Sequence, residues 1–388
     1  MMMDDARPVT PVEADHDGIP ADARAVLRID LGALRANWSR VKSEAATAEC
    51  SAVVKADAYG LGLEQVTQAL IAEGCRTFFV ATLKEGRRVR LVSASAEIFV
   101  LDGLLPGAEH FHAGFDLRPV LSSLQEIDDW ARFCKSVGRR LPAAIHVDTG
   151  INRLGLSAGD VQQLHTDGSS LAAFETVLIV SHLACADDPA SPMNEQQRRE
   201  FNRMRALLPP ARASLANSGG IFQGRHYHYD MVRPGFALYG GRAVEGRPNP
   251  MKPVVRLTAR ILQVRDIPAG QTVGYGGIWT VPKPSRIATV ACGYADGFLR
   301  ALGEPGKPTT VGYIGTYPVP VVGRVSMDLL SVDVSSVPEH LSRRGDWVEV
   351  MGERVTVDDL TDRAGTIGYE LLSRLSRRVH RIYAGAGK

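Results

Sequence analysis

The chain has 388 residues, of which 45% are hydrophobic, so it can form two domains or one large barrel with an addition. Its formal net charge of +2, without any block of lysines and arginines, gives no indication of nucleic acid or an anionic membrane as a partner. Five widely spaced cysteines without a C-x-x-C pair argue against a disulfide framework or a zinc site, and favour a reducing compartment.

The first 22 residues are rich in aspartate and proline, and we expect a disordered extension there. This stretch has no apolar core segment, so it does not have the character of a signal peptide. No apolar run in the chain approaches the ~20 residues that a membrane-spanning helix needs. We therefore expect a cytoplasmic protein without a membrane segment.

Residues 26–30 predict a strand, and Leu31 opens a helix whose apolar residues recur on one stripe. The next stretch, A-V-V-K-A-D-A-Y-G-L-G over residues 52–62, is typical of a strand, a polar turn and the start of a helix. Lys55 would then lie at the carboxyl end of a buried strand, where α/β barrels hold their chemistry. The alternative is a surface lysine at a strand end.

From residue 52 onward, predicted strands alternate with predicted helices. Runs rich in Val, Ile and Phe predict strands at Ala52–Lys55, Thr77–Ala81, Glu97–Leu101, Leu117–Leu121, Ala143–Val147, Thr176–Ser181, Arg212–Ala216 and Tyr229–Arg233. Helical patterns lie between them at Leu63–Glu73, Leu83–Leu91, Leu124–Val137, Val161–Thr166 and Asn194–Leu207. Such alternation predicts parallel pairing, and eight strands predict a (β/α)8 barrel of the TIM type.

The predicted strands share a polar ending. Their carboxyl ends supply Lys55, Thr82, Asp102, Ser122, Asp148, His182, Asn217 with Ser218, and Arg233 with Gly235. The carboxyl ends of parallel strands meet at one end of a barrel, so these side chains are candidates for one site.

The pattern of residue types changes after Gly240. Residues 242–253 are a linker by their Pro and Gly content, and the alternating runs beyond it predict a mostly β domain. We expect a barrel over residues 23–248 and a C-terminal β domain over residues 249–388. The strand predicted near residues 26–30 is a candidate to join the β domain. A helix over Asp358–Leu375 should close the domain, with Thr356 or Asp358 as its N-cap.

Several motifs have two interpretations each. Arg153 could clamp a carboxylate in a fork geometry, or pair structurally with Asp148. His182 is more typical of a hydrogen-bonded histidine behind a site than of a catalyst. Glycine-rich turns near Ser218 and Gly235 could bind phosphate through backbone N–H groups, or be plain turns.

Two further motifs lie in the predicted β domain. Tyr275 stands between glycines in V-G-Y-G-G, where an exposed phenol is one explanation for an aromatic residue in a flexible loop. Met327 interrupts a strand pattern in G-R-V-S-M-D, and a core methionine is the preferred interpretation from the residues alone.

Taken together, the motifs resemble the alanine racemase family, whose members bind pyridoxal 5′-phosphate (PLP) on a barrel with a second β domain. The matches fall in the expected order between about residues 26 and 383. They are A-V-V-K-A-D-A-Y-G, D-T-G-I-N-R-L-G, A-N-S-G-G, D-M-V-R-P-G-F-A-L-Y-G, V-G-Y-G, G-Y-A-D-G and G-R-V-S-M-D.

The resemblance implies an isomerase that interconverts L-alanine and D-alanine with two bases, and it assigns roles to individual residues. Lys55 would form the Schiff base with PLP and act as one base, and Tyr275 would be the other. The implied cofactor-binding residues are Lys55, Tyr59, His182, Asn217, Ser218, Arg233, Gly235 and Phe236, with Arg233 facing the pyridine nitrogen. Arg153 and the N–H of Met327 would bind the substrate carboxylate. No metal is implied.

The family assembly adds a partner. In the family the residues corresponding to Tyr275 and Met327 reach the site from the other subunit, so the resemblance implies a head-to-tail homodimer. Tyr294 would line the entrance to the site.

The implied chemistry explains the residue types. Racemisation removes a proton from one face of the α-carbon and returns one to the other, so two opposed bases are the simplest solution. Lysine and tyrosine both have ordinary pKa values near ~10, which nearby cations can lower. An arginine at the pyridine nitrogen, in place of an acid, would leave that nitrogen unprotonated and limit transamination.

The chain also departs from the family. Many members have a lysine where this chain has His146, and that lysine can be carbamylated to support the active-site arginine. Arg377 falls about where some members have a phosphate-contacting tyrosine. Three alternatives stay open: a serine or broad-specificity racemase, a PLP-binding homeostasis protein without racemase activity, and a fold-related PLP decarboxylase. The β domain that carries Tyr275 argues against the homeostasis protein.

Overall fold

The chain folds as two units in the computed structural model, which describes residues 18–385. Among the described residues, the barrel unit comprises residues 30–254 and 383–385, and the β unit comprises residues 18–29 and 255–382. Most of the predicted N-terminal extension lies outside the described residues. Within the described ranges, no helix combines the length and the apolar character that crossing a membrane requires.

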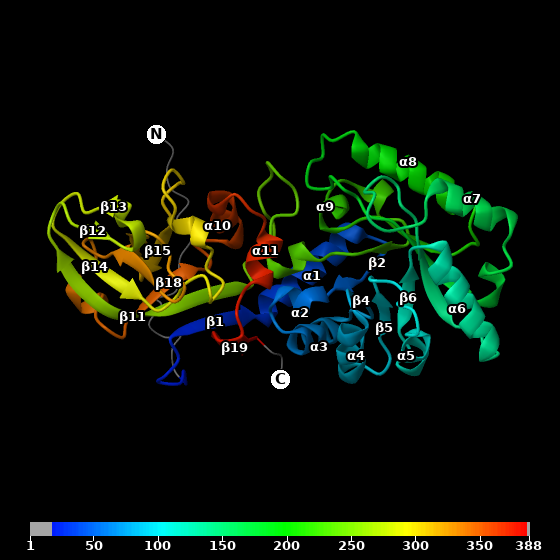
Figure 1. The fold of residues 1–388 in the computed structure, drawn as a ribbon, viewed down its shortest axis with the longest axis horizontal. Coiled ribbons are helices and arrows are strands. Elements are labelled where there is room, and N and C mark those ends of the chain that lie inside the picture. Colours follow the sequence, from blue (N-terminus) through cyan, green and yellow to red (C-terminus); the bar gives the residue numbers. More distant parts are fainter. Residues whose placement is uncertain (1–17, 386–388) are drawn as a thin grey trace. The chain divides into compact units, whose positions relative to one another are not determined.

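Seven parallel strands of the barrel unit form one sheet in sequence order (Figure 1). They are β3 (Ala52–Val53), β4 (Thr77–Val80), β5 (Glu97–Val100), β6 (Arg118–Leu121), β7 (Pro142–His146), β8 (Glu175–Val180) and β9 (Arg212–Ser214). All four residues of β4 are buried. Such continuous burial is expected where helices cover one face of a parallel sheet and packed side chains fill the other.

An eighth strand closes the ring. β10 (Met231–Val232) pairs in parallel with β2 (Glu49–Cys50), which leads directly into β3. Beyond this pair, the N–H of Val53 donates to Pro234 O at 2.9 Å, and the N–H of Arg233 donates to Ala216 O at 3.0 Å. Hydrogen bonds on both sides of this segment join the first strand to the last, which confirms the predicted (β/α)8 barrel.

The predicted first and last strands were too long. The strand expected over Ala52–Lys55 ends at Val53, because Lys55 already begins the helical turn α2 (Lys55–Tyr59). The strand expected over Tyr229–Arg233 is confined to β10, because Tyr229 has a φ of 52° and so leaves the extended region.

The helices of the barrel unit follow the predicted pattern closely. α3 (Leu63–Glu73) has the predicted bounds, and α6 buries Ile127, Trp130, Ala131 and Cys134 along one face. Thr82 and Ser157 begin α4 and α7 with capping boxes. The remaining bounds are α1 (Leu31–Ala45), α4 (Leu83–Val92), α5 (Glu109–Gly114), α6 (Leu124–Ser136), α7 (Ala158–Thr166), α8 (Met193–Arg205) and α9 (Ser218–Ile221).

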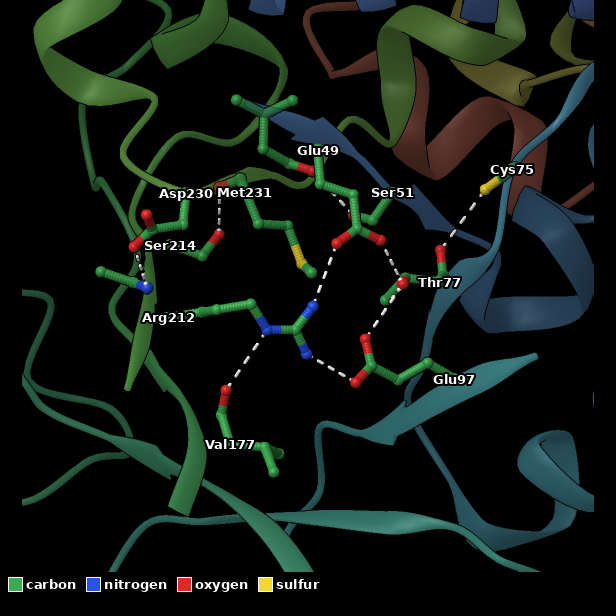
Figure 2. A network of polar contacts seen from close by, with 12 residues as sticks. Glu49, Ser51, Cys75, Thr77, Glu97, Val177, Arg212, Ser214, Asp230 and Met231 are labelled. Carbon is green, nitrogen blue, oxygen red and sulfur yellow. Dashed lines mark hydrogen bonds and ion pairs between the residues drawn. The ribbon is translucent and has the colours of Figure 1, made fainter. Parts of the chain in front are cut away.

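Charged side chains meet at the amino-terminal ends of the barrel strands (Figure 2). Arg212 donates to Glu49 at 3.0 Å and to Glu97 at 2.5 Å, and Glu97 also pairs with Arg118. The Thr77 hydroxyl bonds to both carboxylates. Two arginines and two glutamates balance each other, and the network joins the starts of five strands, so we assign it to stability rather than chemistry.

The β unit is built on one long strand, β11 (Val255–Ile267), which pairs antiparallel with β1 (Ala25–Asp30), β14 (Ser285–Val290) and β18 (Trp347–Met351). In the sheet of this unit, neighbouring strands are hydrogen-bonded in the order β16-β15-β18-β11-β1-β19. β14 pairs with β11 outside this order, and β17 pairs with β14. The added bounds are β15 (Val311–Ile314), β16 (Tyr317–Pro320), β17 (Leu330–Asp333) and β19 (His380–Ala384), with a short pair of β12 (Thr272–Val273) and β13 (Trp279–Thr280).

Two expectations for the β unit were wrong. The single helix over Asp358–Leu375 is two helices, α10 (Val357–Ala364) and α11 (Gly368–Ser373), because Gly365 ends α10 in a left-handed conformation with a φ of 72°. Thr356 is the N-cap of α10 and accepts from the N–H of Asp359. Met327 is not a core residue, since 54% of it is exposed in the loop before β17.

Candidate active site

Polar side chains gather where the barrel strands end. Lys55 follows β3, His182 follows β8 and Arg233 follows β10, all at the carboxyl ends of their strands. Arg153 and Arg233 both act electrostatically on Lys55 and on His182, so the four groups lie near one another. This is the end of the barrel where barrel enzymes hold their reactive groups.

A left-handed turn follows Lys55. Residues 56–59 all have φ values between 54° and 56°, although none of them is glycine. This conformation costs an L-residue roughly 1–2 kcal/mol, so four such residues in a row store strain. Strain of this kind persists only where the surroundings hold it, and the sequence A-D-A-Y gives no sign of it.

Helix α4 holds this turn through Asp57. The backbone N–H of Asp57 donates to Glu85 Oε1 at 3.1 Å, and the Asp57 carboxylate accepts from Arg88 at 2.7 Å. The same carboxylate oxygen accepts from the N–H of Leu63 at 3.3 Å, at the start of α3. Glu85 and Arg88, one helical turn apart on α4, therefore both bind Asp57.

Tyr59 ends the turn and lies against the segment after β10. Its ring stacks on Tyr239 at 4.5 Å between centroids, and the Tyr239 hydroxyl donates to Val53 O at 2.9 Å. A Cβ on Gly235 would lie 2.3 Å from the Tyr59 hydroxyl. Only glycine therefore allows the two segments to approach as they do.

One hydroxyl joins the two glycine-containing turns. Ser218 Oγ accepts from the N–H of Gly235 at 3.0 Å and from the N–H of Ala237 at 3.2 Å. Ser218 is also the first residue of α9, where backbone N–H groups have no carbonyl four residues earlier to bond with. The Ser218 hydroxyl thus holds the turn at residues 235–237 against the start of α9.

Asn217 has a structural position beside this cluster. Its side-chain oxygen accepts from the N–H of Gly220 at 3.1 Å and caps α9, while its amide nitrogen donates to Leu183 O at 3.4 Å. Both polar groups of Asn217 are therefore engaged by the chain itself.

Arg233 is a buried cation without an ion-pair partner among residues 18–385. Only 6% of it is exposed. Its guanidinium donates to the Ser214 hydroxyl at 2.5 Å and to Ser181 O, and it lies 5.8 Å from the centre of the Phe79 ring. Burial lowers the pKa of Arg233 to about 10, which still leaves it charged at neutral pH.

Two histidines near Arg233 are neutral. Burial, followed by the charges of Arg233 and Lys55, lowers the pKa of His182 to about 3. Burial and Arg233 lower the pKa of His146 to about 4, and its Nδ1 lies 3.3 Å from the Ser122 hydroxyl. A site that already holds several cations thus keeps its imidazoles uncharged.

The pKa of Lys55 is also lowered. Burial is the largest cause and Arg153 the next, while Asp102 and Glu85 oppose the shift. A lysine with a lowered pKa has a larger neutral fraction near pH 7, which is the form that can accept a proton or attack a carbonyl.

Arg153 is carried by a turn that Asp148 organises. Asp148 Oδ1 accepts from the N–H groups of Gly150, Ile151 and Asn152 at 2.9, 3.0 and 3.2 Å. The alternative of a structural ion pair between Asp148 and Arg153 is wrong, because Arg153 forms no salt bridge in the described part of the chain. Its exposed guanidinium is free to meet a ligand.

The β unit gathers three exposed side chains of its own. Tyr275 is 71% exposed, Met327 54% and Tyr294 42%. The N–H of Tyr294 donates to Ser326 O at 3.1 Å, and a Cβ on Gly323 would lie 2.6 Å from Val273 O, so the three loops are neighbours. Tyr275 is the exposed phenol that its glycine-rich loop indicated. Arg377 also lies in the β unit.

Sequence reasoning missed several residues that hold the site. Glu85 stands three residues after Thr82, so its capping box could be read from the sequence, but its bond to Asp57 could not. Ser214 was visible as a lone hydroxyl in an apolar strand. Tyr239 stood within a motif of the resemblance without an assigned role, and Gln197 had no signal beyond its place in a buried pattern.

Comparisons with known proteins agree over most of the chain. The model for the N-terminal domain of alanine racemase matches residues 29–243, and the model for its C-terminal domain matches residues 254–383. The alanine racemase of Methylobacterium nodulans is 50% identical over 359 residues, which cover 92% of this chain and 96% of that protein. The alanine racemase of Rhodospirillum rubrum is 48% identical over 365 residues, or 94% of this chain and 96% of the relative.

A solved structure gives the same result. The crystal structure of alanine racemase from Bartonella henselae with covalently bound pyridoxal phosphate superposes with a TM-score of 0.88 at 40% sequence identity. The match covers 93% of this chain and 99% of that one. By its sequence, its two domains and its fold, this chain belongs to the alanine racemase family.

Proposed function

We propose that this protein is a PLP-dependent isomerase that interconverts L-alanine and D-alanine. The observation that carries the proposal is Lys55, which precedes a strained turn and has a lowered pKa, together with the buried Arg233, which has no ion-pair partner among residues 18–385. The family and its close relatives, all alanine racemases, support alanine as the substrate. Residues 23–248 and 249–388 would serve as the cofactor barrel and the β domain.

The residues present fit PLP. Ser218 and Gly219 begin α9, where backbone N–H groups have no carbonyl four residues earlier, and these would hold a phosphate with the 235–236 turn and the Tyr59 hydroxyl beside them. A buried guanidinium without a carboxylate suits a ring nitrogen that needs a donor. Lys55 supplies the amine for covalent attachment. When bound, PLP supplies the electron sink that acidifies the α-proton of an amino acid.

Arg233 would donate a hydrogen bond to the cofactor ring while its guanidinium stays protonated. The hydrogen-bond partners of its guanidinium are a hydroxyl and a backbone carbonyl, and neither takes up or delivers a proton near neutral pH. The neutral His182 lies beside it. We infer that Arg233 donates to the ring nitrogen and leaves it unprotonated, which restricts the reaction to proton exchange. Asn217 would act indirectly, by capping α9 under the phosphate.

Arg153 and the N–H of Met327 would bind the substrate carboxylate. Arg153 is exposed on its turn, and the Asp148 carboxylate holds the backbone of that turn. His146 occupies the place of the family lysine, and its neutral ring bonds Ser122 instead of carrying a carbamate. We therefore infer that Asp148 takes over the support of Arg153.

A second base would come from a partner subunit. Tyr275 and Met327 are exposed together on the β unit, as expected of side chains that complete another copy's site. We propose a head-to-tail homodimer in which Lys55 Nζ moves a proton on one face of the α-carbon and the Tyr275 hydroxyl moves one on the other. The five free cysteines fit the expected cytoplasmic location.

The test is the purified protein with each enantiomer of alanine. We expect optical activity to decay to zero from either side, with equal kcat/KM in both directions because the equilibrium constant of a racemisation is one. Serine would report broader specificity. Release of carbon dioxide would indicate a decarboxylase, and retained optical activity with bound PLP would indicate a homeostasis protein.

Two further experiments test the residues. Borohydride reduction and peptide mapping should place the cofactor on Lys55, and label on another lysine would contradict the site. Tyr275→Phe should slow exchange in both directions and restore activity when mixed with a Lys55→Ala variant, because a heterodimer keeps one complete site. Full activity of Tyr275→Phe alone would refute the two-base proposal.

A further inference from the structure

A glutamine outside the family motifs joins two of the loops that form the site. Gln197 lies on α8 and is only 1% exposed. Its amide nitrogen donates to His182 O at 2.9 Å and to the Thr149 hydroxyl at 3.2 Å. Its amide oxygen accepts from the N–H of Ala184 at 2.8 Å. One buried side chain thus satisfies groups on both the loop after β7 and the loop after β8.

The first of these loops carries Arg153. Thr149 immediately follows Asp148, whose carboxylate holds the N–H groups of the turn that leads to Arg153. The packing of α8 reinforces the contact, because a Cβ on Gly150 would lie 3.8 Å from Gln197 Cγ and 3.4 Å from Met193 Cε. Gln197 therefore fixes the base of the turn from outside the turn.

The second loop leads to Arg233. The Thr149 hydroxyl that accepts from Gln197 also bonds the Ser181 hydroxyl at 2.8 Å, and Ser181 O accepts from the Arg233 guanidinium. Thr149 is 8% and Ser181 1% exposed, so water does not compete for these bonds. Hydrogen bonds therefore connect Gln197 on α8 to Arg233 through Thr149 and Ser181.

We propose that Gln197 is a positioning residue that sets the orientation of the Asp148–Arg153 turn relative to the end of β8, and so the grip on the substrate carboxylate. The inference rests on the proposed function, in which Arg153 binds that carboxylate. An amide suits this place because it both donates and accepts without a charge. A carboxylate at the same position would lose both donors and would bury an unpaired negative charge against His182 O and the Thr149 hydroxyl.

The main test compares Gln197→Met with Gln196→Met. Methionine fills a similar volume but makes none of the three hydrogen bonds, and Gln196 is the exposed neighbour on the same helix. We expect Gln197→Met to raise KM for both enantiomers about 10- to 100-fold, the size typical of a misplaced binding group, with kcat changed less than about threefold. Gln196→Met should leave both constants unchanged.

A binding measurement on the holoenzyme separates affinity from catalysis. Propionate has the carbon chain and carboxylate of alanine without its amino group, so calorimetric titration reports the carboxylate site alone. Its dissociation constant should rise by the same factor as KM in Gln197→Met. Hydrogen exchange at the amides of residues 150–152 and Ala184 should become faster in this variant alone.

Thr149→Val is the second variant, and it keeps the test decisive if Gln197→Met does not fold. Valine removes only the hydroxyl that links Gln197 to Ser181, and we expect a threefold to tenfold rise in KM. Combined with Gln197→Met it should add little, because both changes break one network.

The outcomes distinguish this inference from the proposed function. If the unaltered protein does not racemise alanine, the proposed function fails first. If it does, and both variants keep the normal KM and propionate affinity, or lose kcat alone, then Gln197 does not position the carboxylate-binding turn and the inference is overturned.

Discussion

Glu85 accepts a hydrogen bond from the backbone N–H of Asp57 at 3.1 Å, within the left-handed turn that follows Lys55. Its other carboxylate oxygen accepts from the N–H of Ala81 at 3.0 Å, just beyond β4. A single carboxylate thus ties the strained turn to the neighbouring strand. It also opposes the lowering of the Lys55 pKa, since a negative charge nearby favours the ammonium form.

Glu85→Gln should therefore loosen the turn and lower the pKa of Lys55 further. Glutamine can accept from only one of the two N–H groups, and it carries no charge. We expect about a tenfold loss of kcat, and an acidic limb of the pH–rate profile that moves to lower pH because the base loses its proton more readily. Lys84→Gln, at an exposed position of the same helix, is the control. An unmoved acidic limb would contradict this role.

Gly235→Ala should weaken PLP binding. The new Cβ would lie 2.3 Å from the Tyr59 hydroxyl, so Tyr59 or the 235–236 turn must move. Overpacking of this kind costs about 1–3 kcal/mol, which corresponds to roughly a 5- to 150-fold rise in the dissociation constant of PLP. Absorbance titration of the apoprotein measures it. Gly114→Ala, where no atom lies within 4 Å, is the matched control.

Arg233→Glu should raise transamination relative to racemisation. A carboxylic acid facing the ring nitrogen of the cofactor would keep that nitrogen protonated and strengthen the electron sink. We expect racemisation to fall at least tenfold and pyruvate formation per racemisation event to increase. Pyruvate is measured with a coupled reductase, against the unaltered enzyme. Unchanged partitioning between the two reactions would show that Arg233 does not restrain the cofactor in this way.

Glu97→Ala should destabilise the protein without altering its chemistry. The variant leaves Arg118 and Arg212 without their shared partner at the amino-terminal end of the barrel. Removing one partner from such a partly buried network costs about 3 kcal/mol, which thermal unfolding would show as a lower Tm. Glu200→Ala breaks the exposed pair with Arg203 and should change stability by less than ~1 kcal/mol. A changed kcat/KM in Glu97→Ala would argue against a purely structural network.

Acid should destabilise the fold through its neutral histidines. The folded pKa values of His146 and His182 are about 4 and about 3, below the value of ~6.5 for an unfolded histidine. Between those limits the unfolded chain binds more protons, so stability falls as the pH drops from about 6.5 towards 4. Thermal unfolding across this range should show a shallower fall for His146→Gln than for the exposed control His226→Gln. Equal slopes would contradict this explanation.

The fold class and the family of this protein can be predicted from local patterns of its sequence. The alternation of apolar runs and helical stripes determined the barrel, because parallel strands buried on both faces must be apolar throughout and their crossover helices must be amphipathic. The order of the motifs around Lys55, Arg153, Arg233 and Tyr275 determined the family. These features depend on residues close together in the chain, so they can be recognised before any folding is known.

Other features came only from the tertiary structure. The left-handed turn at residues 56–59 exists because Glu85 and Arg88 hold it from α4, and A-D-A-Y alone would not adopt it. The exposure of Met327 depends on how the loop before β17 lies against residues 293–295, although its pattern favoured a core position. Gln197 acquired its role because α8 carries it between two loops. Long-range contacts decide such positions, since they determine which donors, acceptors and charges each side chain meets.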